Sequence, residues 1–223
     1  MSLAALMLAA SFALAPSNEF VGAAEVNGQL QYRELHTLSE CEPVCREQQV
    51  QYLNASGQPF ASKTLEFVNP LPWQPNYQFS DTRFDIEERV WLDGQQVRIE
   101  RHQGNETNQG SLTRTDSLVI DAGFHPFVQH HLAQLANGQT VDFDFLSSVQ
   151  LDSIAFRLRS LGQDGDTLRV ALQLQNRLLR AFVSDIVLQY DLRDGRLLSY
   201  DGLTNIRRHQ GRGNYNALIR YSY

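Results

Sequence analysis

Aspartate and histidine side chains between residues 121 and 131 are the groups of this chain that acid–base or metal chemistry would use. A site built from Asp121, His125 and His131 can be imagined, but the sequence has no His-Glu-x-x-His or similar spacing. His130 and His131 are adjacent and would point about 100° apart on a helix, so they cannot both bind one metal ion. Nucleophile-elbow and phosphate-binding glycine motifs are also absent. We therefore expect no enzyme, no metal and no cofactor, and keep an enzyme using these residues as an alternative.

The two cysteines, Cys41 and Cys45, enclose Glu-Pro-Val. This spacing does not match the two-residue gap of thioredoxin-type redox motifs, and haem attachment would need a histidine where Arg46 stands. In an oxidising compartment the pair is expected to form a disulfide that fixes the turn between two strands. Because there are only 2 cysteines, a metal site made of cysteines is excluded.

Arginine supplies almost all of the positive charge, with 18 arginines against a single lysine, Lys63. The formal net charge of −6 argues against a nucleic-acid binder, because the affinity of such proteins rests mainly on neutralised phosphates. Arg157, Arg159 and Arg169 share the polar side of one predicted hairpin, and cross-strand ion pairs are expected between them and Asp142 and Asp144 on a neighbouring strand.

A local basic loop stands out near the C-terminus, against the acidic character of the rest of the chain. It is expected either to be simply solvated or to contact an anionic surface or an envelope protein. Its residues are Arg207, Arg208, His209 and Arg212.

Alternation of apolar and polar residues predicts antiparallel strands over most of the chain after residue 25. The fold class is therefore mainly β, as a single strongly curved sheet of about 11 or 12 strands in the form of a half-barrel. Residues 68–78 contain three prolines and Trp73, and we expect this irregular segment to cover an edge or the mouth of the sheet, either as a rigid surface crossing or as a lid. The expected strands are 29–38, 47–54, 60–67, 82–92, 96–102, 111–120, 141–145, 154–158, 167–175, 186–192, 196–203 and 215–223.

Residues 124–135 break the alternation and predict one amphipathic helix. Asp121 is expected to cap its start, and Asn137 with Gly138 to end it. A lone helix with one apolar stripe must bury that stripe, so we expect it on the concave face of the sheet. The stripe consists of Phe124, Phe127, Val128, Leu132 and Leu135.

The N-terminal residues indicate export. Residues 3–15 form an apolar run of 13, whereas a bilayer-spanning helix needs about 20. We interpret 1–24 as a signal peptide cut beside the small residues 21–24, and 25–223 as a single half-barrel domain. A buried N-terminal helix is the alternative, because no lysine or arginine precedes the run. The protein is expected in the periplasm of a Gram-negative bacterium, released rather than lipid-anchored because Glu40 precedes Cys41.

Three segments look like those of an uncharacterised bacterial family of secreted β-rich proteins. They are Ala-Gly-Phe-His-Pro-Phe-Val at 122–128, Tyr-Asp-Leu at 190–192 and Tyr-Asp-Gly-Leu-Thr-Asn-Ile at 200–206. The expected architecture resembles the outer-membrane lipoprotein carrier superfamily. That resemblance implies an unclosed half-barrel, covered by helices, that shelters acyl chains.

The leading hypothesis is a periplasmic, non-enzymatic binding module that carries a lipid or another apolar ligand in its concave face. An integral outer-membrane β-barrel and an envelope interaction or assembly protein with a filled core remain as alternatives. An ordinary dry core would need the same apolar side chains as a ligand site. The expected ligand-binding residues are Phe124, Phe127, Leu132, Leu135, Phe143, Phe145, Ile154, Phe156, Leu158, Leu168, Val170 and Leu172.

Overall fold

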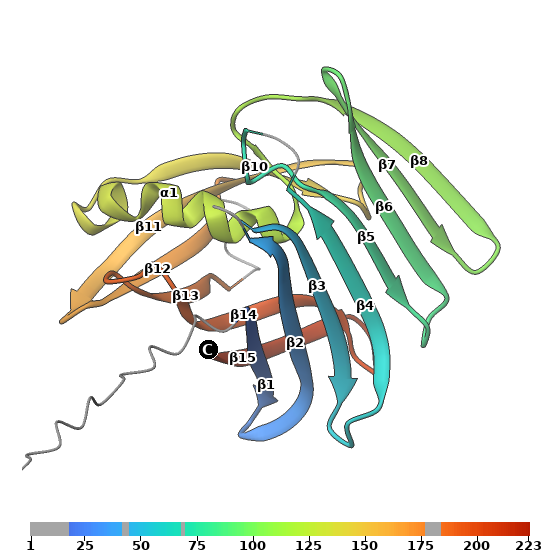
Figure 1. The fold of residues 1–223 in the computed structure, drawn as a ribbon, viewed down its shortest axis with the longest axis horizontal. Helices are drawn as coiled ribbons and strands as arrows, with labels where there is room; N and C mark the ends of the chain where they lie inside the picture. The colour runs from blue at the N-terminus through green and yellow to red at the C-terminus, as the bar shows by residue number, and fades with distance from the viewer. Residues whose placement is uncertain (1–17, 42–44, 68–69, 177–183) are drawn as a thin grey trace, which may run out of the picture.

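The structure, a computed structural model, describes residues 18–41, 45–67, 70–176 and 184–223. Strands dominate it, and the described part contains a single α-helix (Figure 1). In chain order the elements are β1 (Glu19–Val26), β2 (Gln29–Cys41), β3 (Cys45–Asn54), β4 (Pro59–Glu66), β5 (Asn76–Asp81), β6 (Ile86–Asp93), β7 (Gln96–Gln103), β8 (Glu106–Thr113), β9 (Leu118–Val119), a 3₁₀ turn η1 (Asp121–Gly123), α1 (Phe124–Ala136), β10 (Val141–Ser147), β11 (Asp152–Asp164), β12 (Thr167–Leu174), β13 (Ile186–Asp191), β14 (Leu197–Arg207) and β15 (Asn214–Ser222).

All fifteen strands belong to one sheet, in the order β8-β7-β6-β5-β4-β3-β2-β1-β15-β14-β13-β12-β11-β10-β9. Neighbouring strands are antiparallel, apart from the short parallel pair β9 and β10. Almost every neighbour in the sheet is also a neighbour in the chain, which is what hairpin connections produce. The exception is β1 beside β15, so the first and last strands meet in the middle of the sheet. The mainly antiparallel β class is thus confirmed, with an open sheet whose edges are β8 and β9.

The sheet has more strands than the 11 or 12 expected. Strand β1 was missed because its small residues suggested a signal cleavage site, and β5 because it directly follows the proline-rich segment. The expected strand 111–120 is in fact two elements, β8 and β9, which lie at opposite edges of the sheet.

Close packing against neighbouring side chains explains a small residue in β1. A side-chain carbon added at Gly22 would lie 2.9 Å from the Tyr221 ring and 3.1 Å from the Glu34 carboxylate. The predicted cut beside Ala24 falls inside this central strand. Residues 1–17, which carry most of the predicted signal peptide, lie outside the described residues.

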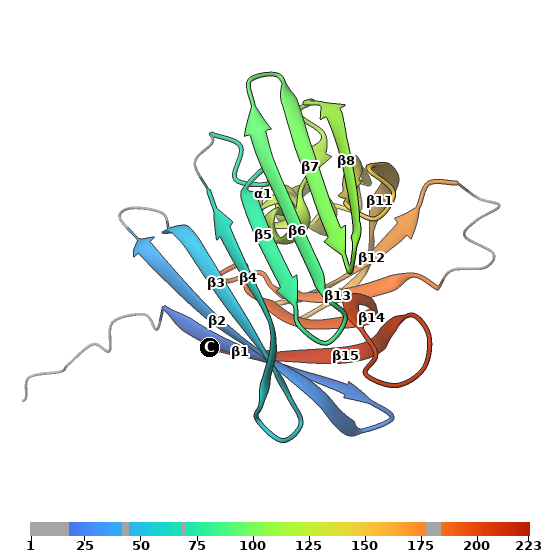
Figure 2. The same ribbon diagram turned by 90° about the vertical axis from the view of Figure 1, so that its right-hand side faces the viewer.

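Two apolar cores pack against the sheet. The first joins side chains of β1–β8, β14 and β15 with Leu118, Ile120 and Leu146 from the segments around β9 and β10. The second joins α1 to β10–β13, and Figure 1 shows α1 beside these strands. Segments that are far apart in the strand order also contact each other. Gly110 on β8 packs against Leu151, in the turn between β10 and β11. Figure 2 gives the view at 90°.

The helix is confirmed at Phe124–Ala136, where 124–135 was expected. Its C-terminal signal is also confirmed, because Gly138 has φ +77° and its amide donates to the Leu135 carbonyl at 3.0 Å. The expected cap is wrong: α1 has no side-chain cap. The Asp121 carboxylate instead accepts from the Ala122 amide at 2.7 Å and binds Lys63. Asp121 sits at φ +43°, too early in η1 to reach the first free amides of α1.

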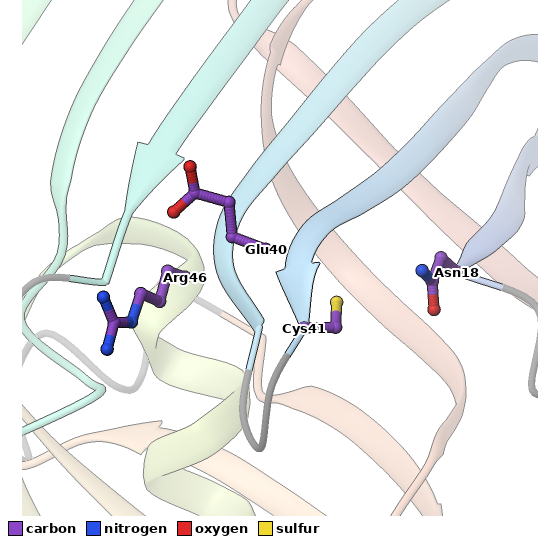
Figure 3. Close-up of a pocket in the computed structure, with 4 residues that line it drawn as sticks. All are labelled: Asn18, Glu40, Cys41 and Arg46. Carbon is purple, nitrogen blue, oxygen red and sulfur yellow. The ribbon is translucent and has the colours of Figure 1, made fainter.

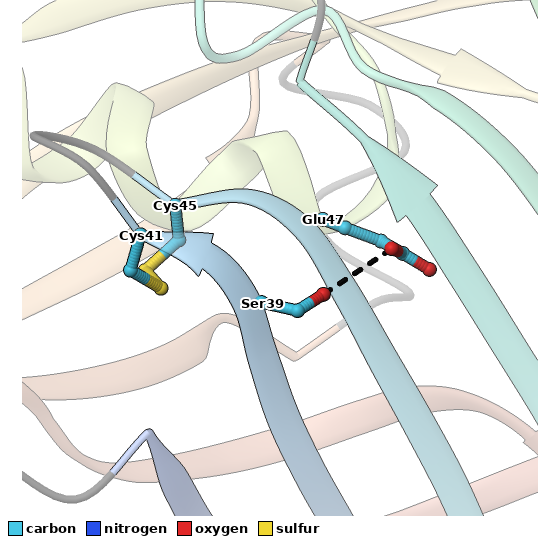
Figure 4. The surroundings of a disulfide bond; sticks show 4 residues. All are labelled: Ser39, Cys41, Cys45 and Glu47. Atoms are coloured by element: carbon cyan, nitrogen blue, oxygen red, sulfur yellow. Dashed lines mark hydrogen bonds between the residues drawn. A yellow bond between two sulfur atoms is a disulfide. The ribbon is translucent and has the colours of Figure 1, made fainter.

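The disulfide between Cys41 and Cys45 is confirmed. The two residues face each other at the turn end of the β2–β3 hairpin, where β2 ends and β3 begins, and two positions away from them Ser39 Oγ donates to Glu47 Oε2 at 3.2 Å (Figure 4). The bridge therefore closes a hairpin whose strands are already paired in register.

Candidate functional site

The helix and the strands beneath it bring together most of the predicted ligand-binding residues. Eight are buried in the second core and three more are partly buried against it, which places eleven of the twelve in one cluster. Ile154 is half-buried on β11 and lies outside that cluster. The buried eight are Phe127, Leu132, Leu135, Phe143, Leu158, Leu168, Val170 and Leu172, and the partly buried three are Phe124, Phe145 and Phe156.

Aromatic rings occupy the centre of this cluster. The Phe143 ring centroid lies 5.0 Å from that of Phe127, 5.8 Å from that of Phe124 and 6.0 Å from that of Phe156. These are the separations of rings in direct contact. In this conformation the apolar side chains of α1 and of the sheet are therefore in direct contact. A ligand can enter between them only if the helix moves away from the sheet.

A few polar contacts hold α1 on the sheet. The His125 ring stacks on the Tyr190 ring with 5.7 Å between centroids, and its Nδ1 lies 3.4 Å from the Tyr190 hydroxyl. Gln129 Nε2 donates to the Gly195 carbonyl at 3.0 Å. Burial lowers the pKa of His125 to about 4, with a smaller contribution from the charge of His36, so the imidazole is neutral near pH 7. Its first-turn position also disfavours a positive charge, because the N-terminal end of a helix is itself positive.

The start of α1 is fixed more firmly. Lys63 Nζ on β4 donates to both carboxylate oxygens of Asp121, at 2.6 and 2.8 Å. A side-chain carbon at Gly123 would lie 2.5 Å from the Trp73 carbonyl oxygen, so only glycine fits there. The Ile120 amide donates to that same carbonyl at 2.9 Å. The N-terminal end of the helix is therefore anchored to β4 and to the segment before β5.

That segment, part of the predicted irregular stretch 68–78, is held by hydrogen bonds to residues just before and at the start of β9. Trp73 is buried and its Nε1 donates to the Asp116 carbonyl at 2.8 Å. Gln74 is fully buried, and its amide nitrogen donates to the Thr115 and Leu118 carbonyls. These bonds favour a fixed cover over a movable lid. Val68 lies outside the described residues, and Asn76 already begins β5.

The structure does not join Asp121, His125 and His131 into one catalytic group. Asp121 pairs with Lys63, His125 with Tyr190, and His131 Nδ1 with Gln134 at 3.0 Å. Burial also lowers the pKa of His131. Across the described ranges, no group of three or more histidine, cysteine or carboxylate side chains is placed to hold a metal ion.

One hydrogen-bonded chain of polar groups was not anticipated. Glu34 is buried and its Oε2 lies 3.2 Å from both His36 Nε2 and the Tyr221 hydroxyl, while His36 Nδ1 lies 2.9 Å from Gln48 Nε2. The Phe20 ring stacks on His36 with 4.1 Å between centroids. Burial raises the pKa of Tyr221, and the Glu34 charge raises it further. The only sequence signal was that Glu34 and His36 share a face with the buried Tyr32.

Two open pockets have no lining residue from α1. One, of about 530 Å³, is lined by Asn18, Glu40, Cys41 and Arg46 near the disulfide (Figure 3). The other, of about 360 Å³, lies between the β1–β2 turn and strands β14 and β15. Its lining residues are Glu25, Val26, Asn27, Gly28, Asp201, Asn216, Ala217, Leu218 and Arg220. Charged groups line both pockets, which does not suit an acyl chain.

The arginines divide into paired and unpaired groups. Arg157 binds Asp142 through two hydrogen bonds of 2.6 and 2.7 Å, which confirms one of the expected cross-strand pairs. Within the described ranges Arg159, Arg169 and Asp144 form no ion pair. The Arg157 hydrogen bonds lower the pKa of Asp142. In the described part of the chain the predicted basic loop forms no ion pair; its arginines are Arg207, Arg208 and Arg212.

Comparison with models of known families, with curated proteins and with solved structures finds no match to this chain. The family resemblance suggested by the sequence therefore stays a prediction. No helix in the described residues has both the length and the apolar character needed to cross a membrane.

Proposed function

We propose that this chain is a non-enzymatic binding module of the bacterial periplasm that carries a lipid or another apolar ligand between α1 and β10–β13. The observation that carries the proposal is the gathering of eleven predicted ligand-binding residues into one apolar cluster under a single helix. An acyl chain in that position would gain about 0.8 kcal/mol for each methylene removed from water.

Opening requires α1 to move away from the sheet. The proposal takes the sheet as a curved half-barrel, supported by the packing of Gly110 on β8 against Leu151 beyond β10. The helix bonds firmly at its start, through Asp121, and more weakly along its length, through His125 and Gln129. A ligand would replace the apolar contacts that the helix stripe gives up, so the net cost of opening is small once the ligand is bound.

The periplasmic assignment rests on the disulfide and the N-terminal apolar run. Disulfides such as Cys41–Cys45 persist in oxidising compartments and are rare in a reducing cytoplasm. Cell fractionation tests the assignment. Release of the protein with the periplasmic fraction is expected, whereas retention in the membrane pellet after carbonate or urea extraction would overturn it.

Ligand binding is tested on the purified chain. Lipid extracted from it and identified by mass spectrometry, and uptake of a fluorescent fatty acid, are both expected. Leu172→Gln, in the cluster, should reduce uptake, whereas Leu203→Gln, at a half-exposed position on β14, should leave it unchanged. Because Leu172→Gln also weakens the core, the wild-type chain is unfolded in urea with and without oleic acid. Bound ligand at about 100 times its Kd should add about 2.7 kcal/mol to the unfolding free energy.

An envelope interaction protein with a filled core is the second candidate, and one observation favours it. The helix and sheet residues of the second core are buried against one another, with Phe143 in contact with three other rings. Absence of extracted lipid, of fatty-acid uptake and of stabilisation by oleic acid would together reject the carrier and leave this candidate.

A further inference from the structure

The loop between β14 and β15 concentrates positive charge on an acidic protein. Residues 207–213, here called the arginine loop, contain three arginines and one histidine but no carboxylate. Arg208 and Arg212 are exposed, and Arg207 is half-buried. Figure 2 shows the loop projecting beyond the ends of the two strands.

A second turn holds the arginine loop in place. Arg83, between β5 and β6, donates to the Arg207 carbonyl at 3.1 Å, and its guanidinium lies 3.7 Å above the Phe60 ring. Asp81 neutralises Arg83 through a 2.6 Å ion pair. The Arg207 guanidinium lies 5.3 Å above the Phe84 ring of the same turn. Arg83 thus serves as an anchor, while Arg207 keeps its charge available beside an aromatic ring.

The charge of the loop is not neutralised by the protein. The other arginines near the C-terminus, Arg193, Arg196 and Arg220, each pair with a carboxylate. Within the described ranges Arg207, Arg208 and Arg212 form no such pair, although the protein carries a net charge of −6. Arg208 donates to the Arg212 carbonyl, which shapes the loop without reducing its charge. These guanidinium groups are therefore available to bind an external anion.

Apolar groups beside these charges favour a lipid surface over an acidic protein. Phe84 is half-buried next to Arg207, and Leu203, four residues before the loop on β14, is half-exposed. Guanidinium groups bind phosphate oxygens in a bidentate manner, and neighbouring apolar side chains enter the headgroup region.

We propose that the arginine loop docks this protein on membranes that contain anionic phospholipids, through bonds from Arg207, Arg208 and Arg212 to headgroup phosphates. This surface involves neither α1 nor the second core, so it goes beyond the proposed carrier function. Docking would hold the protein at a membrane whether or not it carries an apolar ligand.

Vesicle co-sedimentation tests the proposal with the full chain. Binding is expected to phosphatidylcholine vesicles that contain about one third phosphatidylglycerol, and not to phosphatidylcholine alone. It should weaken strongly between about 50 and 500 mM NaCl, since salt screens charges at a surface. Each arginine contributes about fivefold in partitioning, so changing Arg207, Arg208 and Arg212 together to glutamine should lower it about a hundredfold.

A matched control changes net charge equally at exposed arginines elsewhere, namely Arg46, Arg159 and Arg169, again to glutamine. It should bind as the unchanged protein does. Equal loss in the control, or binding that ignores phosphatidylglycerol or salt, would overturn the proposal. Binding to soluble polyglutamate but not to vesicles would overturn it in favour of an acidic protein partner. Vesicle binding without fatty-acid uptake would leave this proposal standing and reject the carrier alone.

Discussion

The ion pair between Lys63 and Asp121 gives the sharpest test of how α1 is positioned. Lys63 is the chain's single lysine, its side chain is 5% exposed, and its Nζ lies 2.6 Å from the Asp121 carboxylate, which is 14% exposed. Lys63→Met keeps the volume of the side chain but leaves a buried carboxylate without its partner. Such a loss typically costs about 3–5 kcal/mol. Since domains are stable by about 5–15 kcal/mol, the effect should be large.

A double-mutant cycle separates the pair from the burial of each partner. Asp121→Asn removes the charge, and asparagine tolerates the φ of +43° at this position. Each single substitution is expected to destabilise strongly, while the double variant should cost about as much as one of them, because no unpaired charge remains. The expected coupling energy is about 3 kcal/mol, measured by urea unfolding with tryptophan fluorescence.

The exposed pair of Arg98 and Asp93, 45% and 58% exposed, supplies the control. Arg98→Met should cost less than about 1 kcal/mol, since solvent screens an exposed pair. If Lys63→Met is as mild as this control, or if the cycle shows no coupling, the two groups do not compensate each other. The anchoring of α1 through β4 would then be wrong.

Three further predictions follow from the fold. Phe127→Ala should lower the unfolding free energy measured in urea by about 3–5 kcal/mol, because it leaves a cavity in the second core. The control Val149→Ala, at a 71% exposed position, should change it by no more than about 0.5 kcal/mol. Equal effects of the two substitutions would contradict the helix packing. Burial lowers the pKa of His125 to about 4, so the unfolded chain takes up a proton first and stability should fall by up to about 3 kcal/mol as pH drops from 6.5 towards 4. His125→Phe should remove that part of the pH dependence, and an unchanged curve would refute the assignment. Because β1 joins β2 to β15, any cleavage of the N-terminal residues should leave the chain starting at or before Glu19, as the intact mass of protein purified from cells will show; a start at Ala24 would contradict this.

The alternation of apolar and polar residues predicted those strands in which one face is more buried than the other. In 167–175 the alternation of Leu168, Val170 and Leu172 with other residues matches β12 at Thr167–Leu174, because these three side chains are buried in the second core while Arg169 between them is exposed. Ala171 and Gln173 lie on the other face but are buried as well. The polar edge strand β8 shows no such contrast, since its residues are exposed or half-buried throughout. Alternation therefore could not mark where β8 begins and ends.

The parts of the site that join distant strands could not be read from the sequence. Lys63 and Asp121 are 58 positions apart, and the sequence around each residue does not indicate that the other is its partner. One local sign existed, since Lys63 shares a strand face with the buried Ala61 and Leu65, where a charge needs a partner. Glu34 gave a similar sign beside Tyr32. A charged residue on a buried face thus predicts that a partner exists but not which residue it is.

The two cores meet at the start of α1, and this junction constrains how a ligand site could open. Ile120 belongs to the first core and Phe127 to the second, with Asp121 and its bond to Lys63 between them. Gly123 packs on the Trp73 carbonyl, which also accepts from the amide of Ile120, so lifting the helix start would disturb Ile120 in the first core as well. Among the described residues, the far end of α1 has no comparable bond, and the nearest polar contact between helix and sheet is that of Gln129, near the middle of the helix. Displacement of α1 should therefore begin at its C-terminal end, turning about the junction at Asp121.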